Sequence, residues 1–165
     1  MNDPSRPETA RRAAGAVRAF GTNSLPALLA VVDTPGHPCR ATAILAIQLM
    51  RRHSGPAFEP GASHLIQCLN LTNRSSVPGF AARALGEFKS PPQIVVPTLT
   101  NCFLSPNKYL RITCVEALAR IGAPAAAALP VLSNALADPT PQVRNAASNA
   151  IMTIAAALPA NDPAR

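Results

Sequence analysis

The sequence contains no tryptophan and a single tyrosine, and aromatic residues make up only 4% of its 165 residues. Strands of β-sandwiches and barrels are enriched in aromatic and β-branched residues, and they are poor in alanine and proline. This chain has the opposite composition, since alanine is abundant and 18 residues are proline. The composition therefore disfavours an all-β domain and predicts a helical chain punctuated by prolines.

Long apolar runs and targeting signals are also missing. The longest apolar stretch, residues 121–137, is interrupted by two prolines, a serine and an asparagine, whereas a membrane-spanning helix needs roughly 20 apolar residues. The N-terminal residues are polar and include Asp3 and Glu8, which fits neither a secretory signal nor a transit peptide. We therefore expect a soluble, cytoplasmic protein that does not enter a membrane.

The four cysteines do not form a metal-binding pattern. They lie 29, 34 and 12 residues apart, at Cys39, Cys68, Cys102 and Cys114. Zinc sites need closely spaced cysteine pairs or histidines at ligand spacing, and neither occurs here. We expect free, buried thiols in a reducing compartment, because an unpaired cysteine behaves as a small apolar residue.

Acidic residues are scarce, with 8 Asp and Glu against 15 Lys and Arg and a formal net charge of +7. The basic residues are dispersed, and no run of five or more forms the tract typical of nuclear import or nucleic-acid binding. The charge permits an acidic partner but does not identify one. Nucleic-acid binding through a net-basic surface is therefore an alternative function.

The sequence does contain an internal repeat. Four similar segments begin 38, 33 and 33 residues apart, at Pro26, His64, Pro97 and Pro130. The same spacing recurs at Arg40, Pro78, Arg111 and Arg144, and again at Ala46, Ala84, Ala117 and Ala150. A period of this length predicts stacked supersecondary units, none of which can bury its apolar face alone.

Each unit has two stretches with the apolar periodicity of amphipathic helices, separated by a turn rich in Pro, Asn, Asp and Thr. The prolines at Pro26, Pro97 and Pro130 are expected in the first turn of the first helix. The apolar stripes of the second helices are predicted to be Ala43, Ile44 and Ile47; Ala81, Ala82, Leu85 and Phe88; Cys114, Val115, Leu118 and Ile121; and Ala147, Ser148, Ile151 and Ile154. Each unit is therefore a helical hairpin.

These patterns predict one solenoid over residues 10–157, flanked by polar tails at 1–9 and 158–165. Its parts are a half repeat at 10–21 and full repeats at 24–52, 62–89, 94–122 and 127–157. The Gly- and Pro-containing segment 51–61 is expected to be a longer loop between the first two units.

The repeats resemble the HEAT repeat family, in particular its bacterial form, which also includes phycobilisome-lyase-type repeats. The last unit carries the family pattern best, with Pro130, Leu132, Leu136, Asp138, Pro139, Val143, Arg144, Ala147, Ala150, Ile151 and Ile154. The resemblance implies an all-α, right-handed α-α superhelix of about four hairpins plus the half repeat.

The resemblance also implies a ladder of hydrogen bonds between units, formed by a turn Asp and an Arg of the second helix. Asp138 and Arg144 occupy both positions in the last unit. Arg111 has a serine opposite it, and Arg40 has an aspartate one position early, at Asp33. In the second unit Thr72 and Pro78 take the two places, so the ladder is expected to be interrupted there.

No catalytic pattern accompanies the repeats. None of the three histidines is followed by glutamate, so the iron-binding pairs of the hydroxylase branch of this repeat class are missing. Nucleophile-elbow, P-loop and dinucleotide-binding motifs do not occur either. Related repeats excise alkylated bases, but the aromatic residues for base stacking are scarce here. A bilin-lyase-like activity remains a less favoured alternative, because that branch is marked mainly by the repeat itself.

The expected binding surface is the concave face formed by the second helices. Its outward positions are Arg83, Glu116 and Asn149 in one row, and Glu87, Arg120 and Thr153 in another. These rows mix charges of both signs with uncharged groups, which suits a protein partner better than a phosphate backbone. The sequence therefore predicts a non-enzymatic scaffold without cofactor, metal or small-molecule substrate, which binds another protein alone or as a segment of a larger array.

Overall fold

Every element in the described part of the chain is helical. The computed structural model describes residues 25–54, 61–69, 76–88 and 91–159. Their helices pair as α2 (Leu25–Asp33) with α3 (Arg40–Ser54), α4 (Gly61–Leu69) with α5 (Val77–Glu87), α6 (Pro92–Asn101) with α7 (Lys108–Ile121), and α8 (Leu129–Ala135) with α9 (Pro141–Ala157). Two short 3₁₀ helices, η2 (Cys102–Leu104) and η3 (Ala123–Ala128), follow α6 and α7.

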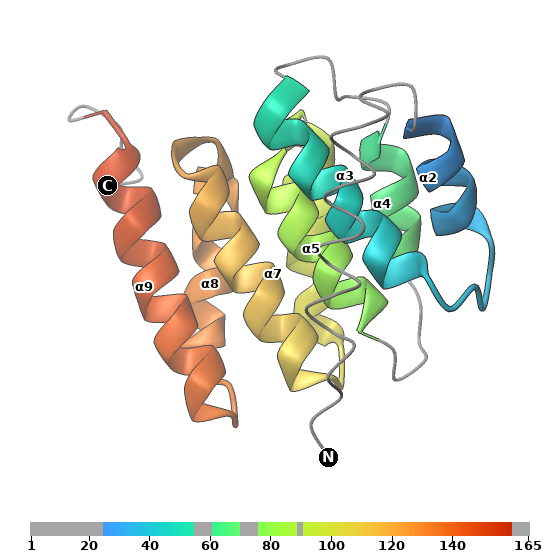
Figure 1. Cartoon of the computed structure of the whole chain (residues 1–165). Coiled ribbons are helices and arrows are strands. Elements are labelled where there is room, and N and C mark those ends of the chain that lie inside the picture. The colour runs from blue at the N-terminus through green and yellow to red at the C-terminus, as the bar shows by residue number, and fades with distance from the viewer. Residues whose placement is uncertain (1–24, 55–60, 70–75, 89–90, 160–165) are drawn as a thin grey trace.

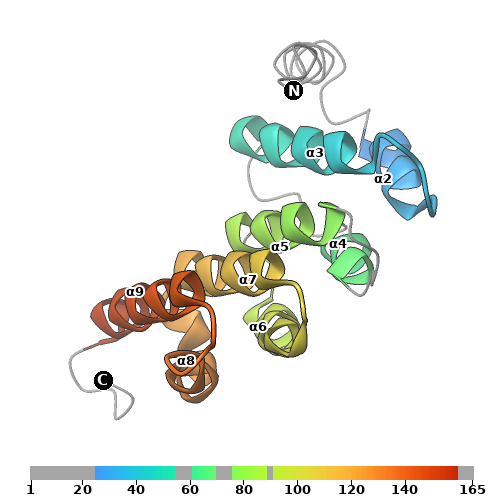
Figure 2. The ribbon, with the colours of Figure 1, turned by 90° about the horizontal axis from the view of Figure 1, so that it is seen from below.

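The four hairpins stack into two layers. The second helices α3, α5, α7 and α9 lie side by side in one layer, and the first helices form the other (Figure 1). Seen from below, the stack curves, and the second helices lie on its inner side (Figure 2). The predicted all-α solenoid of about four hairpins is confirmed. The predicted half repeat at 10–21 lies outside the described residues.

Prolines and one asparagine set several helix starts. Pro130 and Pro141 stand in the first turns of α8 and α9, where a missing backbone N–H leaves no hydrogen bond unmade. The side chain of Asn107 caps α7 by accepting a hydrogen bond from the backbone N–H of Tyr109 at 3.0 Å. The prediction for Pro97 is wrong, because Pro92 already starts α6 and Pro97 lies inside that helix.

The core lies between the two layers and along the junctions of the second helices. It contains the predicted stripe residues Ile44, Leu85, Leu118 and Ile154, each with no exposed surface. One stripe prediction is wrong, since Ser148 is exposed. No described element covers that side of α9, whereas the corresponding side of α7 lies under α9.

Helices α5 and α7 approach each other closely. A Cβ atom placed on Gly86 would lie 2.6 Å from Cα of Ala117, so only glycine allows the two backbones to approach this closely. Gly86 and Ala117 therefore set the spacing between α5 and α7.

The structure also corrects the loop and cysteine predictions. Both ends of the segment expected to be a loop at 51–61 are helical, because α3 continues to Ser54 and α4 begins at Gly61. Cys68, Cys102 and Cys114 are buried as expected, but Cys39 is exposed in the turn before α3. None of the helices in the described ranges has the length and apolar character needed to span a bilayer.

Candidate functional site

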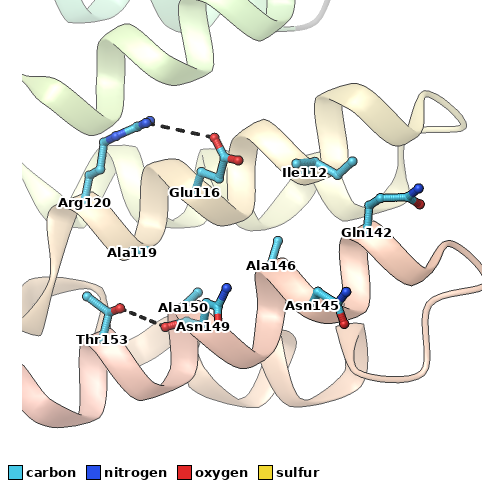
Figure 3. Close-up of a pocket in the computed structure, with 10 residues that line it drawn as sticks. All are labelled: Ile112, Glu116, Ala119, Arg120, Gln142, Asn145, Ala146, Asn149, Ala150 and Thr153. Carbon is cyan, nitrogen blue, oxygen red and sulfur yellow. Dashed lines mark hydrogen bonds and ion pairs between the residues drawn. The ribbon is translucent and has the colours of Figure 1, made fainter.

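A groove runs between α7 and α9. Its volume is about 490 Å³, and it is lined by Ile112, Glu116, Ala119, Arg120, Gln142, Asn145, Ala146, Asn149, Ala150 and Thr153 (Figure 3). Both helices belong to the second-helix layer, so the groove lies on the inner side of the curved stack.

The helical repeat places the longer side chains of the groove in two facing rows. On α7, Ile112, Glu116 and Arg120 follow one another at intervals of four residues. On α9, residues at intervals of three or four form the second row, from Gln142 to Thr153. Residues at these intervals share one face of a helix. Alanines stand between the rows, and their short side chains leave the groove open (Figure 3).

One ion pair supplies the charges of the groove. Nη2 of Arg120 lies 4.0 Å from Oε2 of Glu116, and the two side chains are 39% and 51% exposed. An exposed pair one helical turn apart contributes little to stability. Both groups are therefore available to a partner at small cost to the fold.

The other row offers uncharged hydrogen-bonding groups. The carboxamides of Gln142, Asn145 and Asn149 make no hydrogen bond to any side chain or backbone group of the described residues. Each carboxamide both donates and accepts hydrogen bonds. The groove thus combines one negative, one positive and several neutral polar groups.

The structure brings together some of the residues predicted to bind a partner and separates others. Glu116, Arg120 and Asn149 all line the groove. Arg83 and Glu87 lie on α5 outside it, where Nε of Arg83 is 3.4 Å from Oε1 of Glu87. The prediction did not include the groove residues Gln142, Asn145 and Ile112. Extending the helical interval from Asn149 towards the start of α9 would have found the first two.

A second group of polar residues joins the last two units. Nε of Arg111 donates to Oδ2 of Asp138 at 2.9 Å, and Nη2 donates to Oδ1 at 3.0 Å. Arg111 Nη2 also donates to Oγ1 of Thr140 at 3.2 Å. Oδ1 of Asp138 accepts the backbone N–H of Thr140 at 2.8 Å. The hydrogen bonds from Arg111, together with that from Thr140, hold the pKa of Asp138 below its ordinary value against the effect of burial.

The other ladder residues bind elsewhere. Arg144 does not contact the carboxylate of Asp138; its Nη1 donates to the main-chain oxygen of Asp138 at 2.8 Å. Arg40 donates from Nε to the main-chain oxygen of Val32 at 2.7 Å and from Nη2 to Sγ of Cys68 at 3.5 Å. Burial raises the pKa of Cys68, and the Arg40 charge opposes this shift.

The first two units are joined by a different pair. Nδ1 of His64 lies 2.7 Å from Oδ1 of Asp33. Asp33 thus pairs with a residue of the next unit and not with Arg40. At the position where the other units have a proline, this unit has His64, which makes a hydrogen bond between units.

The described residues contain no cluster of three or more His, Cys, Asp and Glu side chains able to hold a metal ion. The shortest ion pairs in this part of the chain, Asp33–His64 and Arg111–Asp138, join consecutive units. The groove between α7 and α9 is therefore the candidate site, and its chemistry is that of hydrogen bonding and charge pairing.

Comparisons with known proteins agree with this architecture. The family model for HEAT repeats matches residues 62–156, which is more than half of the chain. The fold is similar to the crystal structure of an engineered protein solved by the Northeast Structural Genomics Consortium, with a TM-score of 0.69 and 22% sequence identity over 90% of this chain and 70% of that chain. No curated protein matches the sequence significantly. The chain belongs to the HEAT repeat family.

Proposed function

We propose that this protein is a non-enzymatic HEAT-repeat scaffold that binds another protein in the groove between α7 and α9. HEAT repeats generally serve as protein-interaction scaffolds. The observation that carries the proposal is the lining of the groove, where the Glu116–Arg120 pair faces carboxamides that have no partner among the described residues. A polypeptide offers the same mixture of charged and neutral donors and acceptors.

The charges in the groove favour a protein over a nucleic acid. A phosphate backbone is bound by successive Lys and Arg side chains. The groove contains one arginine, Arg120, and the neighbouring Glu116 offsets its charge. The three buried cysteines, which are unpaired, fit a reducing compartment such as the cytoplasm.

A pull-down tests the proposal. The tagged chain is used to capture partners from a lysate of its own cells, with nuclease treatment and at two salt concentrations, and bound proteins are identified by mass spectrometry. The groove variant replaces Glu116, Arg120 and Asn149 by Ala. The control variant replaces Gln67, Gln93 and Asn134 by Ala, because these exposed polar residues lie on the first helices.

We expect a partner that survives nuclease and salt, is lost with the groove variant and is retained by the control variant. All six positions are exposed on helices, so both variants should keep the helical circular dichroism of the parent chain. Retention of the partner by the groove variant would show that the site is wrong. Recovery of nucleic acid alone, lost on nuclease treatment and at the higher salt, would favour the basic-surface alternative.

A further inference from the structure

Two of the buried cysteines contact each other inside the α6–α7 hairpin. Cys102 begins η2 at the end of α6, and Cys114 lies in the middle of α7. The thiol of Cys114 donates a hydrogen bond to Sγ of Cys102. Sγ of Cys102 in turn donates to the main-chain oxygen of Thr98 at 3.5 Å. The two sulfur atoms are therefore neighbours, although the residues lie 12 positions apart in the sequence.

The repeat places both cysteines in the interior of their hairpin. The equivalent residues of the neighbouring units, 33 positions earlier and later, are buried as well: Leu69 and Ala81 in one unit, Ala135 and Ala147 in the other. The pair thus occupies two positions that the fold buries in three successive units, and of these units only this one has sulfur at either position. Alanine fills both positions in the last unit, so packing there does not require a thiol.

The two thiols differ in access and in acidity. Cys102 is 7% exposed, whereas Cys114 has no exposed surface. The hydrogen bond from Cys114 lowers the pKa of Cys102, and burial raises the pKa of Cys114. The thiolate is the form of cysteine that oxidants attack, and redox-sensitive cysteines often lie beside a second cysteine. Cys102 is therefore the thiol that an oxidant meets first, and Cys114 is its neighbour.

We propose that Cys102 and Cys114 are a modification site, where hydrogen peroxide converts the two thiols into a reversible disulfide. The Cys102 thiolate attacks one peroxide oxygen and the O–O bond breaks, which leaves a sulfenic acid on Cys102. The released hydroxide takes up the proton lost by the Cys102 thiol and becomes water. Sγ of Cys114 then attacks the sulfenic sulfur, and the leaving hydroxide takes the Cys114 proton as a second water. One peroxide is thus reduced while two thiols are oxidised.

The other two cysteines do not share this arrangement. Cys39 is exposed in the turn before α3, and Sγ of Cys68 accepts a hydrogen bond from Nη2 of Arg40 at 3.5 Å. Neither has a thiol as a hydrogen-bond partner within the described ranges. In a reducing compartment a bond between the paired cysteines is transient, because dithiols exchange with it and break it. This site lies apart from the α7–α9 groove, and the proposal does not depend on the groove.

Thiol counting after peroxide treatment tests the proposal. The folded Cys39→Ser chain, which lacks the exposed thiol, is treated with hydrogen peroxide at a dose that fully oxidises Cys39 of the parent chain. Catalase stops the reaction, the chain is unfolded in denaturant, and the remaining thiols are counted as iodoacetamide adducts by intact-mass spectrometry. Trypsin cleaves after Lys108 and Arg111, so a bond between Cys102 and Cys114 joins two separate peptides and is mapped directly.

We expect the treated chain to lose the mass of two hydrogen atoms and to take up one adduct, at Cys68, where the untreated chain takes up three. Dithiothreitol should restore all three. Cys114→Ala should fold, since Ala147 fills the equivalent position, and should keep a sulfenic acid on Cys102 that dimedone traps on unfolding. Cys68→Ala, the control at another buried cysteine, should form the bond unchanged. Three adducts after treatment, a bond that includes Cys68, or no dimedone adduct in the Cys114→Ala chain would overturn the proposal.

Discussion

The guanidinium of Arg111 and the carboxylate of Asp138 form a two-point ion pair across the junction of the last two units, with N–O distances of 2.9 and 3.0 Å. Their side chains are 10% and 11% exposed. The same arginine donates to the main-chain oxygen of Ser105 in its own unit. Arg111 therefore joins its own turn to the turn of the next unit, and it fixes the register in which α9 packs on α7.

Asp138→Asn should lower the free energy of unfolding at pH 7 by at least about 2 kcal/mol, because it leaves the Arg111 charge nearly buried without its counter-ion. The pKa of Asp138 is depressed in the folded chain, so the pair contributes its full stability above the ordinary aspartate pKa of about 3.9. That contribution is lost as the pH falls through the lower, folded pKa.

Urea unfolding of the parent and the Asp138→Asn variant at a series of pH values measures this effect. The difference in unfolding free energy should stay constant from pH 7 to about pH 5 and shrink below about pH 4. Asp33→Asn provides a control at another inter-unit contact, since its carboxylate is 41% exposed. A difference that grows on acidification would contradict the assignment of the depressed pKa to the pair.

Gly86→Ala should destabilise the chain by roughly 1–3 kcal/mol through overpacking. The added methyl group would meet the backbone of Ala117 at 2.6 Å, so α5 and α7 would have to move apart. Gly79→Ala is the matched control on the same helix, because its new Cβ would meet only Oγ1 of Thr113, at 3.9 Å. That variant should be neutral or stabilised by up to about 1 kcal/mol, owing to the higher helix propensity of alanine.

Thermal or urea unfolding followed by circular dichroism compares these two variants. Gly86→Ala is expected to lower the unfolding free energy, whereas Gly79→Ala is expected to leave it unchanged or raise it. A Gly86→Ala variant as stable as the Gly79→Ala variant would mean that the α5–α7 contact is looser than the structure shows.

Cys39 should be the only cysteine that reacts rapidly with iodoacetamide in the folded chain. It is exposed, whereas Cys68, Cys102 and Cys114 are buried. Burial also raises the pKa of Cys68 and of Cys114, which lowers their thiolate fraction. A hydrogen bond from Cys114 lowers the pKa of Cys102. Cys102 is therefore protected from the reagent only by its burial, which leaves 7% of the residue exposed.

Intact-mass spectra should show one fast adduct in buffer and four adducts in denaturant. Replacing Cys39 by Ser should remove the fast adduct and leave the slow ones unchanged. A second adduct that forms as rapidly as the first, and maps to Cys102, would show that η2 does not shield this thiol.

The solenoid was predictable from the sequence because similar residue types recur at a constant spacing. The 33-residue interval placed Leu85, Leu118 and Ile151 at equivalent positions, and the first two are fully buried. Ile151 is only partly buried and Ser148 is exposed, because burial of a stripe depends on the next unit and not on the helix itself. The periodicity of one helix does not show whether another helix packs against its outer side.

The site was less predictable than the fold, since it depends on contacts between units. The sequence pattern placed Asp138 opposite Arg144 in the same unit, but the carboxylate reaches back to Arg111. The turn between α8 and α9 projects towards the preceding hairpin, and this direction follows from the stacking of the helices. Likewise Arg83 and Glu116 occupy equivalent positions, yet Glu116 lines the α7–α9 groove and Arg83 lies outside it.

Photo-cross-linking tests the binding of a protein in the α7–α9 groove most directly. A photoreactive phenylalanine derivative replaces Asn149 inside the groove or Gln93 on the first-helix layer, and the chain is irradiated in lysate after nuclease treatment. We predict a discrete protein adduct from position 149 that is absent from position 93 and is lost when Glu116 and Arg120 are also replaced by Ala. The same adduct from both positions, or none from position 149 while a partner still co-purifies, would contradict binding in the groove.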